Sequence, residues 1–276
     1  MWYTCMRRSA ILFSEGMIVK MAYRYDLHCH TSEGSKCSDI SIDEMIELYH
    51  EIGFSGFCVT DHFTSSMNPL TDDASWEERV NLSYDIFQKA HKKSLKFGLS
   101  VFFGIEYRLT PDIDRASQAY GADFIFLNIE KDWLLNNKCI FREKPDILFD
   151  KAREAGVFII HAHPMFGREL TLFPYSVDAV EIINGGFNNA GDICNVNAKK
   201  YAEMYDLLET AGTDIHRFDQ QLITGIEMEK PCFTVVELIN TIKQKNATLY
   251  HTTRKITDYW QEKQNKASEI RKKSNR

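Results

Sequence analysis

Short apolar segments rich in β-branched and aromatic residues alternate along this chain with longer amphipathic segments. Their spacing predicts strands at residues 23–28, 56–60, 99–106, 123–128, 157–161, 179–183 and 223–226, with a further candidate at 247–250. Between these strands it predicts helices at residues 42–52, 76–97, 146–155, 196–210 and 234–245. Such alternation is typical of buried parallel strands joined by helices. The sequence therefore predicts an α/β barrel or a doubly wound sheet.

Residue types at the helix ends agree with this reading. Three helix starts carry a hydroxyl and a carboxylate three residues apart, as in a capping box: Ser41 and Glu44, Ser75 and Glu78, Thr234 and Glu237. Four glycines follow helical stretches, as C-terminal caps do: Gly53, Gly98, Gly156 and Gly212. No repeat or low-complexity linker divides the chain, so we expect one domain at residues 22–250. An N-terminal extension (1–21) precedes it and a basic C-terminal tail (251–276) follows.

The charge distribution bears on partners and location. The chain has a net charge of −6, yet its last 26 residues carry eight lysines and arginines against three carboxylates. An acidic body disfavours sequence-independent binding to nucleic acid, and leaves the tail as the one region that would contact it. The seven cysteines form no C-x-x-C pair, and no apolar run is long enough for a membrane span or a signal peptide. We therefore expect a cytoplasmic protein with no membrane partner.

Histidines and carboxylates gather where the predicted strands end. The motifs are Asp26-Leu-His-Cys-His30, Thr60-Asp-His62, Gly104-Ile-Glu106, Asn128-Ile-Glu130, His161-Ala-His163 and Asp214-Ile-His216. In a parallel barrel all strand C-termini open onto one face, where the active site is built. Alternate residues of an extended strand point the same way, so His28 and His30 can hold one cation together. His161 with His163, and Asp214 with His216, repeat that spacing.

A mixed set of imidazoles and carboxylates favours Zn²⁺, Mn²⁺ or Fe²⁺ over Mg²⁺, which prefers oxygen ligands. The candidate ligands outnumber those that one tetrahedral zinc can use, so we expect two or three divalent ions. Neighbouring ions of this kind clamp an oxyanion and lower the pKa of a bridging water. The sequence thus predicts hydrolysis of a phosphoester by a metal-activated hydroxide.

The motifs as a set resemble those of the PHP superfamily, named for polymerase and histidinol phosphatase. DLHCHT at 26–31, TDH at 60–62, GIE at 104–106, AHP at 162–164, EIINGG at 181–186 and GTDIH at 212–216 occur in the family's order. The resemblance implies an α/β fold, a distorted (βα)7 TIM-like barrel of the PHP type in a single domain, with a trinuclear metal site. It implies as metal ligands His28, His30, His62, Glu106, His163, Asp214 and His216. His161 falls where the family has no ligand, so we place it behind the ligands.

The chain departs from the family pattern at two places. The family commonly has a histidine after the fourth strand, and here that position falls on Glu130, which we expect to ligate in its place. The family also often has an Asp or His five or six residues after the first H-x-H motif. Those positions are Ser35 and Lys36, so Glu33 or Asp39 must substitute, or a ligand is missing and one metal site is weak.

We expect a small phosphorylated substrate for a phosphatase or phosphodiesterase. Arg168 and Arg217 follow ligand motifs and would bind phosphate oxygens, because arginine suits bidentate recognition. Asp61 would orient the neighbouring ligand or move protons behind it. Two alternatives stay open: a metal-dependent amidohydrolase, and a non-catalytic PHP-like scaffold whose basic tail contacts nucleic acid.

Overall fold

The computed structural model describes residues 22–64, 66–109, 121–166, 172–187, 191–219 and 222–255, together with 257, 258, 261, 262 and 265. The strands are β1 (Tyr23–Asp26), β2 (Gly56–Val59), β3 (Ser100–Arg108), β4 (Asp123–Leu127), β5 (Phe158–Ala162), β6 (Ala179–Asn184), β7 (Leu208–Gly212), β8 (Leu222–Met228) and β9 (Ala247–Lys255). The helices are α1 (Ile42–Glu51), α2 (Trp76–Ser94), α3 (Lys131–Asn136), α4 (Pro145–Glu154), α5 (Ile193–Tyr205) and α6 (Val235–Lys243). The expected extension (1–21), Arg168 and most of the expected tail lie outside the described residues.

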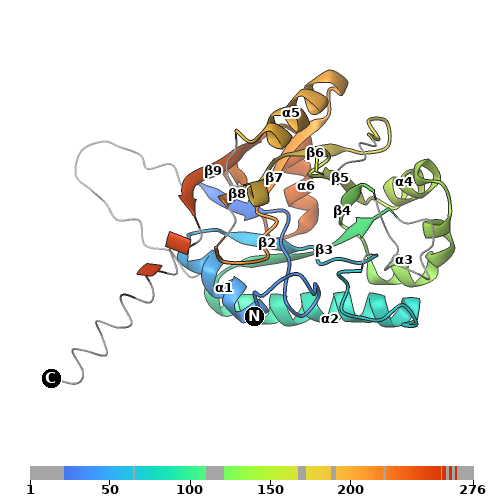
Figure 1. Ribbon diagram of the computed structural model, residues 1–276, viewed down its shortest axis with the longest axis horizontal. Helices are drawn as coiled ribbons and strands as arrows, with labels where there is room; N and C mark the ends of the chain where they lie inside the picture. Colours follow the sequence, from blue (N-terminus) through green and yellow to red (C-terminus); the bar gives the residue numbers. More distant parts are fainter. Residues whose placement is uncertain are drawn as a thin grey trace, which may run out of the picture.

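The strands form one sheet in the order β7-β6-β5-β4-β3-β2-β1-β8-β9. Its first strand, β7, comes back against β8 and β9, so the sheet is nearly closed into a barrel with helices around it (Figure 1). This confirms the expected α/β, TIM-like barrel in a single domain. The described residues contain nine strands, where the family resemblance implied seven.

Strand β4 is antiparallel to both of its neighbours, so the expectation that all strands are parallel is wrong. β1, β2 and β3 are parallel to one another, as are β5, β6 and β7, whereas β4 is antiparallel to both β3 and β5. β8 is likewise antiparallel to β1. A parallel pair needs a crossover, usually a helix, and the sequence predicts no helix between β3 and β4. The start of β4, rather than its end, therefore lies beside the ends of β3 and β5.

The region around β7 also differs from the expectation. Helix α5 ends at Tyr205, where Asp206 adopts a left-handed φ of 50°, so the helix expected at 196–210 is too long. Residues 208–212 instead form β7, and Gly212 closes this strand rather than capping a helix. Strand β9 continues to Lys255, beyond the boundary expected at residue 250. The three expected capping boxes are confirmed.

Both faces of the sheet are buried, which explains why its strands read as continuous apolar runs. In β4, Phe124 and Phe126 join a cluster with α2, α3 and α4, whereas Ile125 and Leu127 join a cluster with α6. Alternate residues of one strand thus supply two hydrophobic layers. In the part of the chain that the structure describes, no helix combines the length and apolar character that a membrane span requires.

His161 belongs to this core and not to a metal site. Its ring stacks on Phe124 at 4.8 Å between centroids and meets Phe173 and Tyr201 edge-on. Burial, with a smaller contribution from His163, lowers the pKa of His161 to about 3. The expected pairing of His161 with His163 is wrong, because β5 ends at Ala162 and His163 has a positive φ of 26°. The side-chain alternation of a strand does not extend across that change of direction.

We predict that His161→Phe makes the protein less sensitive to acid. His161 is neutral in the folded protein, whereas an unfolded chain takes up the proton below about pH 6.5. The stability it contributes is therefore complete above pH 6.5 and is lost as the pH falls towards 3, by about 4–5 kcal/mol in all. Urea unfolding at several pH values should show a shallower loss for His161→Phe than for wild type, whereas His50→Phe, at an exposed position on α1, should follow wild type. Equal slopes for wild type and His161→Phe would contradict this reading.

Candidate metal centre

The expected ligands gather at one end of the barrel, where the parallel strands end; we call this end the mouth. His28 and His30 follow β1, His62 follows β2 and Glu106 lies within β3. His163 follows β5, and Asp214 and His216 follow β7. The structure brings all seven together in four overlapping groups whose ligand atoms lie within 4.8 Å of one another: His28, His30 and Glu106; His30, His62 and His216; His28, His163 and Asp214; and Glu106, Asp123 and His163.

Glu106 lies at the centre of this arrangement and is 1% exposed. Its Oε1 is 3.5 Å from His28 Nε2 and 3.2 Å from His163 Nε2. Its Oε2 is 3.6 Å from His30 Nε2 and also contacts His62 Nδ1. One carboxylate therefore faces four imidazoles from three different strand ends, as a ligand shared between metal ions would.

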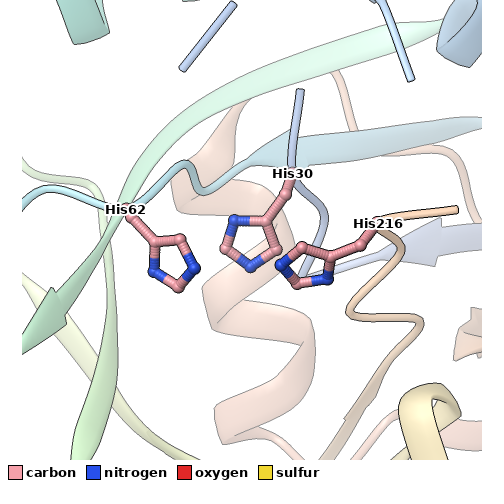
Figure 2. A group of neighbouring side chains, drawn as sticks. All are labelled: His30, His62 and His216. Carbon is pink, nitrogen blue, oxygen red and sulfur yellow. The ribbon is translucent and has the colours of Figure 1, made fainter. Parts of the chain in front are cut away.

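His30, His62 and His216 form a second compact group, which we call the three-histidine group (Figure 2). The ring of His30 stacks between the other two, with centroids 4.4 Å from His62 and 4.3 Å from His216. The three rings come from the ends of β1 and β2 and from the loop after β7. Three imidazoles from separate elements can therefore surround one ion.

Asp214 connects the remaining ligands. Its Oδ1 is 3.1 Å from His30 Nε2 and 3.4 Å from His28 Nε2, and its Oδ2 is 3.9 Å from His163 Nε2. Its backbone has a positive φ of 49°, which turns the chain sharply between Asp214 and His216. The two side chains stay close, with His216 Nδ1 3.4 Å from Asp214 Oδ1, and each belongs to a different ligand group.

The charges of the cluster are set by its own members. Burial raises the pKa of Glu106, but His62 and hydrogen bonds from His163 and His28 outweigh it and hold the pKa well below the usual range. Burial lowers the pKa of His28, but Asp214 and Glu181 outweigh it and raise the pKa well above normal. Glu106 is therefore ionised near neutral pH, and His28 favours its protonated form.

Two observations indicate that these residues fit divalent metal ions. His62 Nδ1 and Glu106 Oε2 are buried and in contact, yet neither has a hydrogen-bond partner of good geometry among the described residues. His28 Nε2 and His30 Nε2 face each other at 3.0 Å, although two neutral imidazole nitrogens can share only one proton. A cation placed among these atoms would give His62 Nδ1 and Glu106 Oε2 a partner and could take the lone pairs of His28 and His30 as well, and imidazole with carboxylate suits transition metals.

A set of polar residues behind the cluster orients the ligands. Asp61 is 3% exposed and accepts hydrogen bonds from Thr31 N at 2.7 Å and from Ser35 Oγ at 2.8 Å. Ser35 Oγ also lies 3.1 Å from His30 Nδ1 and accepts a hydrogen bond from the backbone N–H of His62 at 3.1 Å. Asp61 thus acts on His30 and His62 through Ser35 and does not reach the mouth itself.

Glu181 is a supporting residue to which the sequence reasoning gave no role. Its Oε1 is 3.0 Å from His28 Nδ1, and its Oε2 accepts hydrogen bonds from the backbone N–H of His163 and from Asn184 Nδ2. A Cβ at Gly212 would lie 2.4 Å from His28 Cβ and 2.7 Å from Glu181 Oε1. Only glycine fits at that position, so β7 can approach the His28–Glu181 pair closely.

Cys37 is a further residue beside the three-histidine group. Burial raises the pKa of its thiol, but hydrogen bonding to the imidazoles of His216 and His62 lowers it by more, to about 7. The residues we expected to supply a ligand here do not reach the cluster. Glu33 accepts a hydrogen bond from the first N–H of α1 and one from Lys89, and Asp39 is exposed and pairs with Arg217.

A pocket of about 250 Å³ opens beside the ligands. It is lined by His62, Glu106, Arg108, His163, Phe166, Asn184, Gly186, Phe187, Asp214 and His216. Arg108 Nε and Nη2 donate to Asp123 Oδ1 and Oδ2 at 2.6 and 2.5 Å, so the guanidinium is held in one orientation at the pocket wall. The sequence reasoning missed Asp123 because β4 was taken to be parallel, and it missed Arg108 because this residue belongs to no motif.

Glu130 and Arg217, two of the expected site residues, do not line this pocket. Glu130 is exposed and lines a different pocket, with Tyr84 and Phe233, because antiparallel β4 carries it away from the mouth. Its expected position beside Glu106 is therefore wrong, and Asp123 at the start of β4 takes that place. Arg217 is half exposed, 3.6 Å from Asp39, and does not line the pocket. Arg168 lies outside the described residues.

Comparisons with known proteins agree with this geometry. A family model described as PHP domain matches residues 26–266, whereas a search of curated proteins finds no match. A two-domain protein from Bacteroides vulgatus ATCC 8482, which contains a predicted PHP-like metal-dependent phosphoesterase, has a similar fold, with a TM-score of 0.59 and 13% identity. The alignment covers 83% of this chain and 65% of that protein, so this chain spans less than two thirds of its length.

Two further solved structures share the fold at comparably low identity. PsfC from Pseudomonas syringae PB-5123 gives a TM-score of 0.54 at 15% identity, over 84% of this chain and 92% of PsfC. The lesion-specific endonuclease PfuEndoQ from Pyrococcus furiosus gives 0.51 at 13% identity, over 83% of this chain and 58% of that one. At these identities the likeness is one of fold.

We predict that Glu106→Gln weakens metal binding, whereas Glu130→Gln does not. Glu106→Gln removes the charge that four imidazoles share, so metal affinity should fall by more than about tenfold. Glu130→Gln changes an exposed residue on another face and should leave metal content unchanged. Metal analysis after dialysis against limiting Zn²⁺ or Mn²⁺ measures this, with circular dichroism to check the fold. Loss of metal from Glu130→Gln would contradict this assignment and indicate that Glu130 is a metal ligand.

Proposed function

The chain belongs to the PHP domain family, and on this premise we propose that it is a metal-dependent phosphoesterase that acts on small phosphorylated molecules. The observation that carries the proposal is the set of four overlapping ligand groups around Glu106, beside a pocket lined by an arginine. Divalent ions held there would lower the pKa of a bound water and neutralise phosphate oxygens. Phosphoester hydrolysis needs both effects.

We assign distinct tasks to the residues of the chain. His28, His30, His62, Glu106, His163, Asp214 and His216 would hold the ions, and Asp123 would complete the group that contains Glu106 and His163. Arg108, fixed by Asp123, would bind a non-bridging phosphate oxygen, because its orientation is set before substrate arrives. Asp61 and Glu181 would keep the imidazoles in place.

The pocket supports a small substrate. Its volume of about 250 Å³ lies near the lower limit of ordinary ligand pockets. Phe166 and Phe187 stand at its wall with ring centroids 5.7 Å apart, and Phe166 is 66% exposed. These rings would give apolar contact to the leaving group, while the polar half of the pocket receives the phosphate.

We infer a cytoplasmic location for this activity. The six cysteines within the described residues are all free, and three of them are buried. Unpaired cysteines in this number are typical of proteins in a reducing compartment. The inference would fail if the mature protein were found outside the cytoplasm with its cysteines oxidised.

The proposed function predicts metal-dependent turnover of generic phosphoesters. Para-nitrophenyl phosphate and its bis-ester should be tested with the apo protein after addition of Zn²⁺, Mn²⁺, Fe²⁺ or Mg²⁺. We expect turnover with at least one transition metal, inhibition by inorganic phosphate, and loss of turnover in Glu106→Gln. No turnover with any of these ions would refute the proposal. Turnover of acylated amines that is indifferent to phosphate would indicate an amidohydrolase instead.

We predict that Arg108→Lys raises KM roughly tenfold, with a smaller change in kcat. Lysine keeps the positive charge beside Asp123 but loses the planar fork that binds two oxygens at once. Arg217→Lys, at the half-exposed position outside the pocket, should leave KM within about twofold. Steady-state kinetics on the best generic ester compare the two variants. A large effect at Arg217 with none at Arg108 would reverse the assignment.

A further inference from the structure

Asn184, the last residue of β6, lies among the carboxylates of the metal centre. It is 1% exposed and lines the pocket beside the ligands. Its Nδ2 donates hydrogen bonds to Glu181 Oε2 at 2.9 Å and to Asp214 Oδ2 at 3.2 Å. A side-chain amide nitrogen carries two hydrogens, so Asn184 directs one at each carboxylate. It thus connects a supporting carboxylate with a carboxylate that faces the ions.

The partners of the Asn184 amide fix its orientation. Its Oδ1 accepts a hydrogen bond from the backbone N–H of Gly186 at 2.8 Å. Turning the amide over would place its oxygen against two carboxylates and its nitrogen against an N–H, so all three hydrogen bonds would be lost. The residue at position 186 must also be small, because a Cβ there would lie 2.8 Å from Asn184 Oδ1.

Two features of the fold hold Asn184 in this position. The pairing of β6 with β7 shifts its register between Glu181 and Ile183, as at a β-bulge. In a regular strand residues 181 and 184 would point to opposite faces, and the shift allows their side chains to meet. Asn195 of α5 holds the backbone: its Oδ1 accepts a hydrogen bond from Asn184 N at 2.9 Å, and its Nδ2 donates to the carbonyl oxygen of Asn184 at 3.3 Å.

Asp214 depends on this contact more than Glu181 does. Glu181 also interacts with His28 Nδ1 and with the backbone N–H of His163, each at 3.0 Å. Asp214 Oδ2, in contrast, is 3.2 Å from Asn184 Nδ2 and 3.9 Å from His163 Nε2. The Asn184 amide is the nearer of these two groups, so it sets the rotation of the Asp214 carboxylate and thereby decides which oxygen faces which imidazole.

We propose that Asn184 is a positioning residue that fixes Asp214 as a ligand of the ion in the group of His28, His163 and Asp214. The inference rests on the metal centre of the proposed function and deepens it. A neutral amide suits this place because it donates to two buried carboxylates without adding a charge, whereas a cationic side chain would repel the ion. Without the amide, the Asp214 carboxylate can rotate and the ion loses a fixed ligand.

The first test is a double-mutant cycle on zinc retention, measured by competition with a chelator and metal analysis, without any turnover. Asn184→Leu keeps a side chain of similar shape but has no donor. In the full-length protein it should weaken the retention of one Zn²⁺ by at least about tenfold, and by less than about twofold when Asp214→Ala is already present. Asn136→Ala removes an exposed amide on α3 and should retain zinc as wild type does.

A second readout remains valid if Asn184→Leu folds poorly, because it leaves Asn184 in place. In the NMR spectrum of the ¹⁵N-labelled, metal-free protein, both side-chain amide hydrogens of Asn184 should lie downfield of those of Asn136, since each is bound to a carboxylate. In Asp214→Ala, one of the two signals should move upfield, and the signal of the hydrogen bound to Glu181 should stay. If neither signal moves, Asn184 does not hold Asp214 and the proposal is overturned.

The outcomes separate this inference from the proposed function. Zinc retention by Asn184→Leu equal to that of wild type, or an equal loss with and without Asp214→Ala, would overturn the positioning role and leave the metal centre intact. Coupling between Asn184 and Asp214 in a protein that hydrolyses no phosphoester would support the positioning role and refute the function. No binding of any divalent ion would refute both.

Discussion

A single buried carboxylate, Glu106, determines how the mouth of this barrel must be built. A carboxylate that is removed from water costs several kcal/mol unless cations or hydrogen-bond donors replace its hydration. Glu106 is 1% exposed and is surrounded by four imidazoles that arrive from three strand ends. Its burial is therefore tolerable only if those histidines are held in place and a positive charge, from protons or metal ions, lies among them.

The fold meets this requirement by supporting each imidazole from behind. Asp61 fixes Ser35, which contacts His30 and the backbone of His62. Glu181 holds the far nitrogen of His28 and the backbone of His163. The strands fix the positions of the backbone and these carboxylates fix the ring orientations, which is the arrangement that keeps a metal site rigid.

The sequence was sufficient to predict the parts of the site that depend on local periodicity. The histidines just beyond β1, β2 and β5 were found because each follows a short apolar run, and Glu106 because it lies in one; Asp214 and His216 were found from their spacing in a later motif. Glu130 was misplaced because periodicity does not reveal strand direction: β4 is equally apolar whichever way it runs. Asp123, which lies beside Glu106 in its place, is the first residue of β4, and no motif marked it in the sequence.

The raised pKa values in the cluster mean that protons compete with metal ions for several of its imidazoles. Burial lowers the pKa of His163, but Glu106, Asp214 and Asp123 outweigh it and raise the value to about 9. Asp214 and Glu181 raise the pKa of His28, and Glu106 raises the pKa of His62, each against the lowering effect of burial. A metal ion must displace those protons to bind, since only neutral imidazole coordinates. The same carboxylates that attract the metal ion also attract its competitor, the proton. The metal affinity of the centre is therefore set by the difference between these two interactions.

A ligand that carries no proton near neutral pH is free of that competition. Burial, with His216 and His62, holds the pKa of His30 well below normal. His30, shared by two of the ligand groups, is therefore the imidazole at which the proton competes least with a metal ion.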